Sequence, residues 1–568
     1  MFASLPTDYH EFIGWAWPQF DPYYQDLIAR SLSADNVGPW LADWSRISRM
    51  AQEAYSRLQV ATTLNTADAE AEKRYHTFLG EVYPQVEAAE QKLKQKLLAS
   101  GLEPAAFEIP LRNMRAEADL FREANLPLLV EDRMLSSQYD KIVGAQAVQW
   151  EGRELTLQQL RPILQNPDRP MRERAWRLAS ARWLADRSAI DELWTKTWPL
   201  RKQIALNADC ADYRAYRWRE LLRFDYTPDD CTAFQRAIEE VVVPAASRIY
   251  DRARRRLAVD ALRPWDVDQD RDPLNFPVLQ PFQTAEELMS KSAAIFQHVD
   301  PQLGEYYATL RRERLLDLDN RKGKAPGGYC AEFPLAQRPF IFMNAVGVRD
   351  DVRTMLHESG HAFHVFETNH LPYVQQSQVT MEFAEVASMA MELLAAPYLL
   401  ETYGGFYTAP EAARDRVEHL ERIILFWPYM AVVDAFQHWA HTHPDGGDPA
   451  ACDARWAELW SRFMPGVDWS GLAEAMTTGW QRKQHIHRTP FYYVEYGLAQ
   501  LGAVQVRRNA LKDQASALAN YRKALSLGGT RSLLELYRTA GAQFSFDTGT
   551  LREAVDLIEQ VIDQLQAA

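Results

Sequence analysis

One segment of this sequence, from Thr354 to His364, reads TMLHESGHAFH and contains the pattern HExxH. On an α-helix, side chains four residues apart stand one above the other, so the imidazoles of His357 and His361 can bind one metal ion. Glu358 cannot easily join them as a ligand, and it is placed instead to take a proton from a water molecule at the metal. Apolar residues recur around the motif at helical spacing. The segment therefore predicts a metal centre on a helix whose other side lies in the core.

Two further residues of this segment carry expectations of their own. Gly360 lies inside the predicted helix, where glycine costs about 0.5–1 kcal/mol relative to alanine, so we expect another backbone or a ligand to approach it closely. His364 is a third histidine on the face of the motif. Because a fourth protein ligand would fill the position that catalytic zinc leaves to water, we expect His364 to support the site rather than bind the metal.

The third protein ligand is expected from the segment Met381–Glu392, which reads MEFAEVASMAME and predicts another helix. Its three glutamates, Glu382, Glu385 and Glu392, share one face. A glutamate on a neighbouring helix can reach across to the histidine pair, and spacing alone allows Glu382 or Glu385. The competing interpretation is a surface stripe of solvated glutamates.

The rest of the chain predicts a mostly helical protein with a small β-sheet. Helical periodicity runs, for example, from Ala69 to Ser100 and stops at Gly101. The convincing strand signal is Arg338–Val346, directly before the HExxH segment. We expect an extended peptide to pair with the strand residues Phe340–Ala345 by adding a strand to the sheet.

Length and composition narrow the class of protein. At 568 residues the chain predicts two lobes, an N-terminal helical lobe over residues 1–195 and a catalytic lobe over 196–568, with the two interleaved. The net charge of −14 and the lack of a basic cluster argue against nucleic acid as a partner. No apolar run reaches the roughly 20 residues of a membrane helix. Four scattered cysteines and no signal-like N-terminus favour the cytoplasm.

The motifs together resemble the thimet oligopeptidase and oligoendopeptidase F family of zinc metallopeptidases, in particular its bacterial branch with the Pz-peptidase-like enzymes. The resemblance runs from about Gly327 to Gly502 and rests on these ordered motifs: GGY at 327–329, RPFIFMN at 338–344, HESGHAFH at 357–364, FAEVASMAMELL at 383–394 and HRTPFYYVEYGLAQLGA at 487–503.

The resemblance implies a fold, a cofactor and roles for individual residues. It implies a helical body of two lobes around a deep channel, with one Zn²⁺ per chain on the channel floor, which admits short peptides and excludes folded proteins. Glu385 then becomes the third ligand beside His357 and His361, and Glu358 the general base. Glu392 matches the closing glutamate of the family pattern, which supports the ligands.

The resemblance also implies a role for the C-terminal motif. Tyr492 and Tyr496 are four residues apart, and the family uses a tyrosine here to hydrogen-bond the oxyanion of the tetrahedral intermediate. A histidine just upstream has a similar task, for which His485 and His487 compete. The sequence departs from the thimet branch at Arg488-Thr489-Pro490, in place of a glycine-containing loop.

These observations predict a zinc endopeptidase that hydrolyses internal bonds of short, unfolded oligopeptides, with no nucleic-acid or membrane partner. Three alternatives stay open. One is a zinc exopeptidase of the HExxH class, resembling a carboxypeptidase, or less readily an aminopeptidase, since no GxMEN sequence precedes the motif. Another is a non-catalytic helical binding protein stabilised by a metal. The third is a metal hydrolase that acts on something other than peptides.

Overall fold

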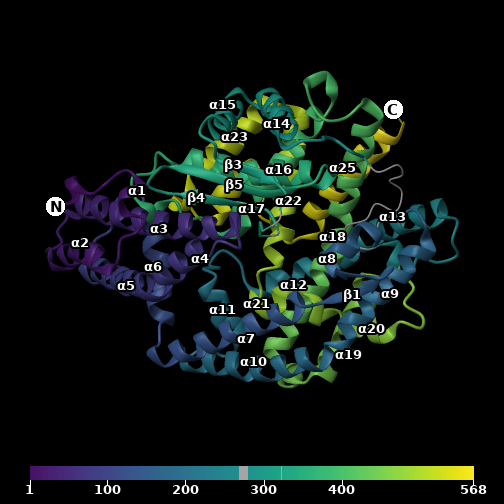
Figure 1. Cartoon of the computed structure of the whole chain (residues 1–568), viewed down its shortest axis with the longest axis horizontal. Helices are drawn as coiled ribbons and strands as arrows, with labels where there is room; N and C mark the ends of the chain where they lie inside the picture. Colours follow the sequence, from purple (N-terminus) through teal and green to yellow (C-terminus); the bar gives the residue numbers. More distant parts are fainter. Residues whose placement is uncertain (165, 268–278, 322, 326, 568) are drawn as a thin grey trace. The chain divides into compact units, whose positions relative to one another are not determined.

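The computed structural model describes residues 1–164, 166–267, 279–321, 323–325 and 327–567. It is mostly helical with small sheets, as the sequence predicts (Figure 1). The chain forms two compact units, each from three stretches: the first from 1–118, 279–412 and 502–544, the second from 119–278, 413–501 and 545–568. The lobe boundary suggested between residues 195 and 196 falls within helix α10 (Arg187–Asn207), which lies wholly in the second unit.

The first unit carries the three-stranded sheet. Its helices are α1 (Tyr9–Phe12), α2 (Trp17–Ala29), α3 (Val37–Leu64), α4 (Ala69–Thr77), α5 (Tyr83–Ser100), α6 (Glu108–Leu120), α14 (Ala285–Val299), α15 (Pro301–Arg312), α16 (Arg349–Thr368), α17 (Met381–Ala395), α23 (Gln514–Ser526) and α24 (Leu533–Thr539). The helix predicted from Ala69 to Ser100 is present as α4 and α5, joined by a π-helical turn. It ends at Gly101, whose φ of 67° is a left-handed conformation that glycine adopts at no steric cost.

The second unit contains α10 and these further elements: α7 (Leu126–Gly144), β1 (Ala147–Trp150), β2 (Arg153–Thr156), α8 (Leu157–Leu164), α9 (Arg169–Ala185), α11 (Tyr213–Glu220), α12 (Pro228–Ala237), α13 (Val243–Arg256), α18 (Ala409–Thr442), α19 (Pro449–Phe463), α20 (Ala473–Thr477), α21 (Gln484–Arg488), α22 (Val494–Lys512) and α25 (Thr548–Ala567). Helix α18 begins, and α22 ends, in residues of the first unit.

The sheet of the first unit fixes where a peptide could pair. Its strands β3 (Leu316–Asp319), β4 (Tyr329–Phe333) and β5 (Arg338–Ala345) lie in the order β3-β5-β4. The predicted strand before the motif is therefore confirmed as β5. However, β5 is the central strand, paired with β3 on one side and β4 on the other, so its hydrogen-bonding groups are already used. The expectation that a peptide pairs with Phe340–Ala345 is wrong, and among the described residues the edge on this side belongs to β4.

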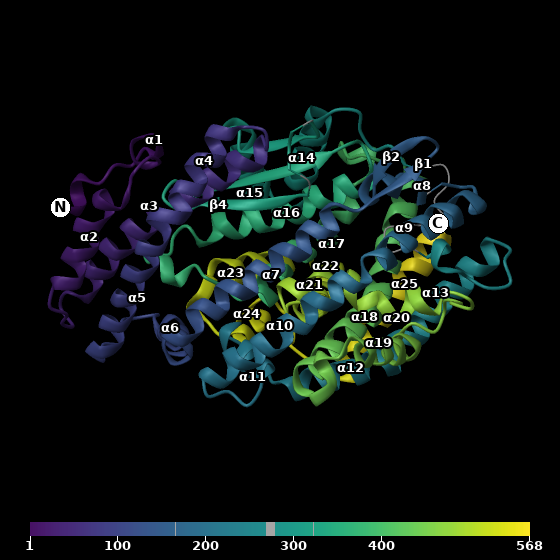
Figure 2. The same ribbon diagram turned by 60° about the horizontal axis from the view of Figure 1, so that its bottom comes forward.

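Helix α16, which carries HExxH, packs against this sheet and against α17 (Figures 1 and 2). Its start is fixed by Asp351, whose carboxylate accepts hydrogen bonds from the backbone N–H groups of Val346, Gly347 and Val348 at 2.8–2.9 Å. The three residues that carry these N–H groups connect the end of β5 to the start of α16. A carboxylate at a helix N-terminus also interacts favourably with the helix dipole. The cap sets the position of the two histidines relative to the strand.

Gly360 lies where the backbone of α17 comes close to α16. A Cβ atom at this position would lie 2.5 Å from the carbonyl oxygen of Ala387 and 2.6 Å from the Cα of Ser388, both on α17. Backbone atoms cannot move aside as the end of a flexible side chain can. The expectation that a second backbone approaches this glycine is therefore confirmed, and the contact holds the glutamate-bearing helix against the histidine-bearing one.

We expect Gly360→Ala to lower the free energy of unfolding by about 1–3 kcal/mol, because the added methyl group forces the two helices apart. Thermal or urea denaturation measures the change. Gly80→Ala is the matched control, since a Cβ there meets nothing within 4 Å. The control should be neutral or slightly stabilising through helix propensity. Equal stability of both variants would contradict the close-contact interpretation of Gly360.

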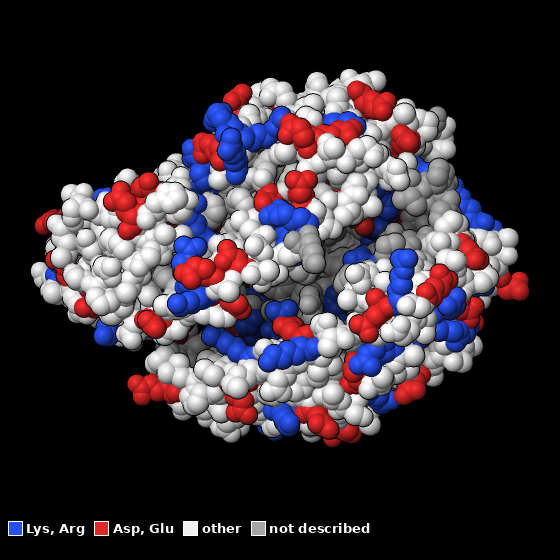
Figure 3. All heavy atoms as spheres, in the orientation of Figure 1, with Lys and Arg blue, Asp and Glu red and all other residues white. Residues whose placement is uncertain are grey.

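Lysine and arginine side chains are interspersed with acidic ones over the face drawn in Figure 3. None of the helices in the described part of the chain combines the length and the apolar character that a bilayer span requires.

Candidate active site

Three side chains of the first unit converge as the motifs suggest. The Nε2 atoms of His357 and His361, both on α16, lie 3.4 and 3.8 Å from Oε2 of Glu385 on α17. One ligand atom from each of the three residues lies within 4.8 Å of the other two. Glu385 is 5% exposed, while the two histidines are partly exposed. The arrangement therefore combines a buried carboxylate with two imidazoles that keep part of their surface exposed.

Two neighbouring groups orient these side chains. Glu392 lies further along α17 than Glu385, and its Oε1 atom lies 2.7 Å from Nδ1 of His357. With Nδ1 hydrogen-bonded to this carboxylate, the Nε2 lone pair is free to face a metal. The hydroxyl of Ser388 donates to Oε2 of Glu385 at 3.0 Å. Both contacts fix ligand orientation in advance of metal binding.

The charges of this group favour a bound cation. Burial lowers the pKa of His357, but hydrogen bonds to Glu385 and Glu392 outweigh it and raise that pKa well above its usual value. Burial and the adjacent His357 lower the pKa of His361 to about 4, so this imidazole is neutral and can donate a lone pair. The carboxylate of Glu385 and the imidazoles of His357 and His361 form the kind of three-residue donor set that zinc takes in proteins. The residues fit a zinc ion.

Glu358 lies beside this group and opposite the sheet edge. It is 8% exposed, and burial raises its pKa to about 7, with the positive charge of His357 opposing the shift and Glu385 adding to it. The backbone N–H of Cys330, on β4, donates a hydrogen bond to the Glu358 carboxylate. This contact was not foreseen from the sequence. The one signal for it is the GGY motif, which ends at the first residue of β4, directly before Cys330.

The remaining candidates on these two helices lie apart from the ligand group. Glu382 is 1% exposed, and its backbone carbonyl accepts a hydrogen bond from the hydroxyl of Tyr537. Its carboxylate is not part of the group that could hold a metal. His364 is buried, and burial lowers its pKa to about 4, while a backbone hydrogen bond at Leu525 partly opposes that shift. The structure therefore places Glu385, and neither Glu382 nor His364, next to the histidine pair.

The predicted histidine and tyrosine group at the C-terminal motif lies in the second unit. The ring of His485, on α21, contacts those of Tyr492 and Tyr496, with centroids 6.1 and 6.2 Å away. The two tyrosine rings meet edge to face at 5.2 Å. All three side chains are half-buried, so each keeps part of its surface exposed.

His487 has a different environment from His485. It is 5% exposed and stacks on Tyr139 at 4.4 Å, with Trp194 and Trp480 also against it. Burial and the charge of Arg201 lower its pKa to about 3. Such a ring is part of the core of the second unit. Of these two histidines, His485 is the one whose ring packs against Tyr492 and Tyr496.

The loop that replaces the glycine-containing segment is held firmly. Phe491, which follows Arg488-Thr489-Pro490, has a φ of 66° and is fully buried. Its backbone N–H donates to Oε1 of Gln437 at 2.7 Å, and its carbonyl accepts from Arg223 at 2.6 Å. Arg223 also pairs with buried Glu495 at 2.7 Å. These contacts offset the strained backbone and set the tyrosines in place.

A second group in the described residues has metal-ligating side chains, namely Cys231, Asp434 and His438 of the second unit. Its surroundings do not suit a divalent cation. Nη1 of Arg214 lies 3.4 Å from Nδ1 of His438, so a positive charge is already next to the group and the other ring nitrogen carries the proton. Asp434 also accepts a hydrogen bond from Gln235 at 2.7 Å. We regard this trio as a buried polar network.

Comparison with known proteins gives relatives of one kind. The chain is 24% identical over 302 residues to oligopeptidase PepF of Bacillus subtilis (strain 168), a match covering 50% of this chain and only 41% of that protein. It is 21% identical over 510 residues to the oligoendopeptidase F homolog of Mycoplasma pneumoniae, covering 81% of this chain and 78% of that protein.

Solved structures match over nearly the whole chain, and they confirm the predicted fold class. One, of a protein assigned as an oligoendopeptidase F, has a TM-score of 0.86 at 27% identity and covers 99% of this chain and 98% of its own. Another, Pz peptidase A with an inhibitor, has a TM-score of 0.87 at 25% identity and covers 99% of both chains. Residues 163–555, which include the histidine pair and Glu385, match Peptidase family M3. The resemblance seen in the motifs is confirmed: the chain belongs to peptidase family M3.

Proposed function

We propose that this protein is a zinc-dependent endopeptidase that hydrolyses internal bonds of short, unfolded oligopeptides. One observation carries the proposal: ligand atoms of His357, His361 and Glu385 lie within 4.8 Å of one another, and Glu358 lies beside them. The relatives named oligopeptidase and oligoendopeptidase support peptides as the substrate class. The four cysteines, which lie far apart in the sequence with no CxxC pair, favour a cytoplasmic location.

In this proposal, His357, His361 and Glu385 hold one zinc ion per chain, and Glu392 keeps the His357 ring in its binding orientation. When bound, zinc lowers the pKa of a water molecule towards about 7 and polarises a carbonyl group as a Lewis acid. The partly exposed sides of the two imidazoles leave room for water and substrate.

Glu358 acts as the general base. Its carboxylate takes a proton from the water that attacks the scissile carbonyl carbon, and then gives that proton to the nitrogen of the leaving amine. The low exposure of Glu358 favours proton transfer, because burial brings its pKa near neutrality. Tyr496 or Tyr492, assisted by His485, donates a hydrogen bond to the oxyanion of the tetrahedral intermediate.

Strand β4 positions the substrate. Its outer edge is the side that no strand covers among the described residues, and its residue Cys330 contacts Glu358. An extended peptide that adds to this edge in antiparallel fashion brings a backbone carbonyl to the general base. Backbone pairing accepts many sequences but needs an unfolded segment, which agrees with short flexible peptides as substrates.

The test is a cleavage map of quenched peptides of increasing length, blocked at both ends and incubated with the zinc-loaded protein. We expect cuts at internal bonds of short peptides, no cutting of a folded protein, and loss of cleavage on chelation with restoration by added zinc. Release of terminal residues from unblocked peptides alone would instead indicate an exopeptidase. A folded, zinc-loaded protein that cuts nothing, and unfolds on chelation, would indicate the non-catalytic binding protein.

A further inference from the structure

A cavity of about 470 Å³ lies in the first unit at the end of β4 that points away from Tyr329. Side chains of α3, α5 and α6 line it together with Glu332 and Pro334 and a short segment around Gln375. This volume accommodates an amino-acid side chain with room for water. The cavity is therefore large enough to take one residue of a peptide that runs along β4.

Acidic side chains outnumber basic ones in the lining of this cavity. Four glutamates line it against one lysine, Lys94, which pairs with Glu117 at 2.8 Å. We call the four, Glu87, Glu90, Glu117 and Glu332, together with the cavity they line, the glutamate pocket. The carboxylate of Glu90 accepts hydrogen bonds from Tyr24, Trp44 and Ser48. In the described part of the chain, the carboxylates of Glu87 and Glu332 have neither a hydrogen-bond partner nor an ion-pair partner within 4 Å.

Other groups of the glutamate pocket also suit a positively charged donor. Asn113 lines it, and the Oδ1 atom of this residue is buried with no hydrogen-bond partner in the described structure. Tyr55 and Tyr83 supply aromatic surface, whose faces attract cations. The positive charge of Arg49 acts on Glu332. The guanidinium of Arg49, however, donates its hydrogen bonds to the backbone carbonyls of Leu371 and Pro372. Acceptors and aromatic faces thus remain available to a ligand that brings N–H donors.

The position of the glutamate pocket along β4 indicates which residues of a bound peptide it would face. Glu332 follows Cys330 by two residues on β4, a distance of about 7 Å along the strand, and both side chains lie on the same face. Cys330 contacts Glu358 through its backbone, so the scissile bond belongs near Cys330. For a peptide antiparallel to β4, the direction from Cys330 to Phe333 runs towards the N-terminus of the peptide. The glutamate pocket therefore faces residues before the cleaved bond.

We propose that the glutamate pocket binds a cationic group of the substrate on the N-terminal side of the cleaved bond, either a lysine or arginine side chain or the N-terminal ammonium of a short peptide. The inference rests on the proposed endopeptidase function and assigns it a substrate preference. Glu332 is a specificity-determining residue in this assignment, because it joins the pairing strand to the pocket.

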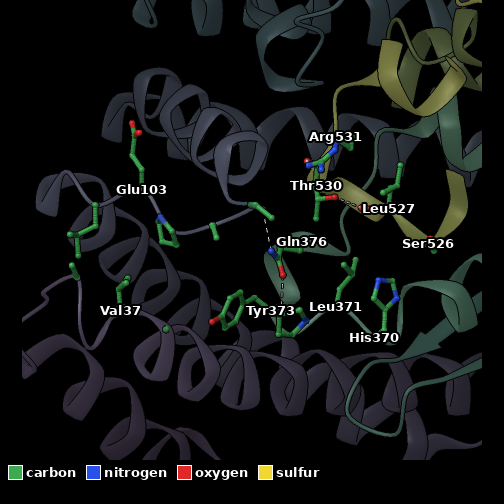
Figure 4. Close-up of a pocket in the computed structure, with 17 residues that line it drawn as sticks. Val37, Glu103, His370, Leu371, Tyr373, Gln376, Ser526, Leu527, Thr530 and Arg531 are labelled. Atoms are coloured by element: carbon green, nitrogen blue, oxygen red, sulfur yellow. Dashed lines mark hydrogen bonds between the residues drawn. The ribbon is translucent and has the colours of Figure 1, made fainter. Parts of the chain in front are cut away.

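The larger cavity of the first unit, about 770 Å³, offers no comparable chemistry (Figure 4). Its wall is mostly apolar, from residues such as Val37, Leu371 and Leu527. The amide of Gln376, a polar group of this wall, donates to the carbonyl of Ala106 and accepts from the N–H of Tyr373. None of its lining residues belongs to β4 or to the ligand-bearing helices.

The experiment measures kcat/KM for quenched peptides, blocked at both ends and neutral except for one arginine moved through each position on both sides of the cleaved bond. We expect arginine at one or two positions before the cleaved bond to raise kcat/KM about tenfold over the all-neutral peptide, and Glu332→Gln to remove that gain. Glu305→Gln, which removes the same charge at an exposed site on α15, is the matched control. A second arm compares free and acetylated N-termini on short neutral peptides, and separates the terminal ammonium from the side chain as the source of charge.

The all-neutral peptide keeps this inference separate from the proposed function. If wild-type protein cuts no peptide, the endopeptidase function fails, whatever the arginine series shows. If neutral peptides are cut but arginine gives no gain, or gives it only after the cleaved bond, the glutamate pocket does not bind as proposed. An equal loss by Glu332→Gln on neutral and cationic peptides would also overturn the inference, and Glu87→Gln, which leaves β4 intact, repeats the test from the opposite wall.

Discussion

Glu358→Gln should reduce kcat/KM for peptide cleavage by about 10²–10⁴-fold while the protein keeps its zinc. The amide has the shape of the carboxylate and fits the same largely buried position, where Glu358 is 8% exposed. It cannot take a proton from water, so the base step is lost. Because Glu358 is outside the group of ligand atoms that converge, zinc affinity should change little. Steady-state kinetics with zinc content determined on the same sample measure both quantities.

The thermal midpoint of Glu358→Gln separates chemistry from folding. Burial disfavours the charged carboxylate, as the raised pKa of Glu358 shows, so a neutral amide should leave stability unchanged or slightly higher. An inactive variant with intact stability and full zinc content is the expected result. A variant that cleaves peptides at the wild-type rate would remove Glu358 from the mechanism, and one that loses zinc would make it a ligand.

The chemistry of this protein is read easily from its sequence because it depends on short-range geometry. The four-residue step from His357 to His361 fixes two ligand positions once a helix is assumed, and α16 meets that assumption. Gly360 likewise indicates a close helix contact, since a glycine inside a helix needs a steric reason, and the backbone of α17 supplies it. Local periodicity also identifies β5 correctly.

Other features depend on contacts between distant residues, and periodicity carries no information about them. Strand order is the clearest example: β5 has the strongest strand signal because it is central and buried, and for the same reason it cannot pair with a peptide. The weaker β4, with the exposed Glu332, is the edge. The choice between His485 and His487 also needs the structure, because only packing against Tyr139 and Trp480 places His487 in the core.

The choice between Glu382 and Glu385, which spacing leaves open, leads to a second large effect. Glu385→Ala should weaken zinc binding by well over about 100-fold, because losing even a supporting partner of a ligand costs about 10–100-fold. Cleavage at limiting zinc should fall in proportion. The substitution removes the carboxylate that lies 3.4 Å from Nε2 of His357 and 3.8 Å from Nε2 of His361. Competition with a chromophoric chelator measures the affinity directly.

Glu382→Ala is the matched control, since it removes a buried carboxylate from the same helix, one turn earlier. It should lower the free energy of unfolding, because the vacated volume is buried, yet leave the zinc dissociation constant near that of wild type. Metal affinity and stability therefore change independently in the two variants. If Glu382→Ala lost zinc and Glu385→Ala kept it, the convergence of these three side chains would not be a metal site, and the proposed zinc chemistry would have to be abandoned.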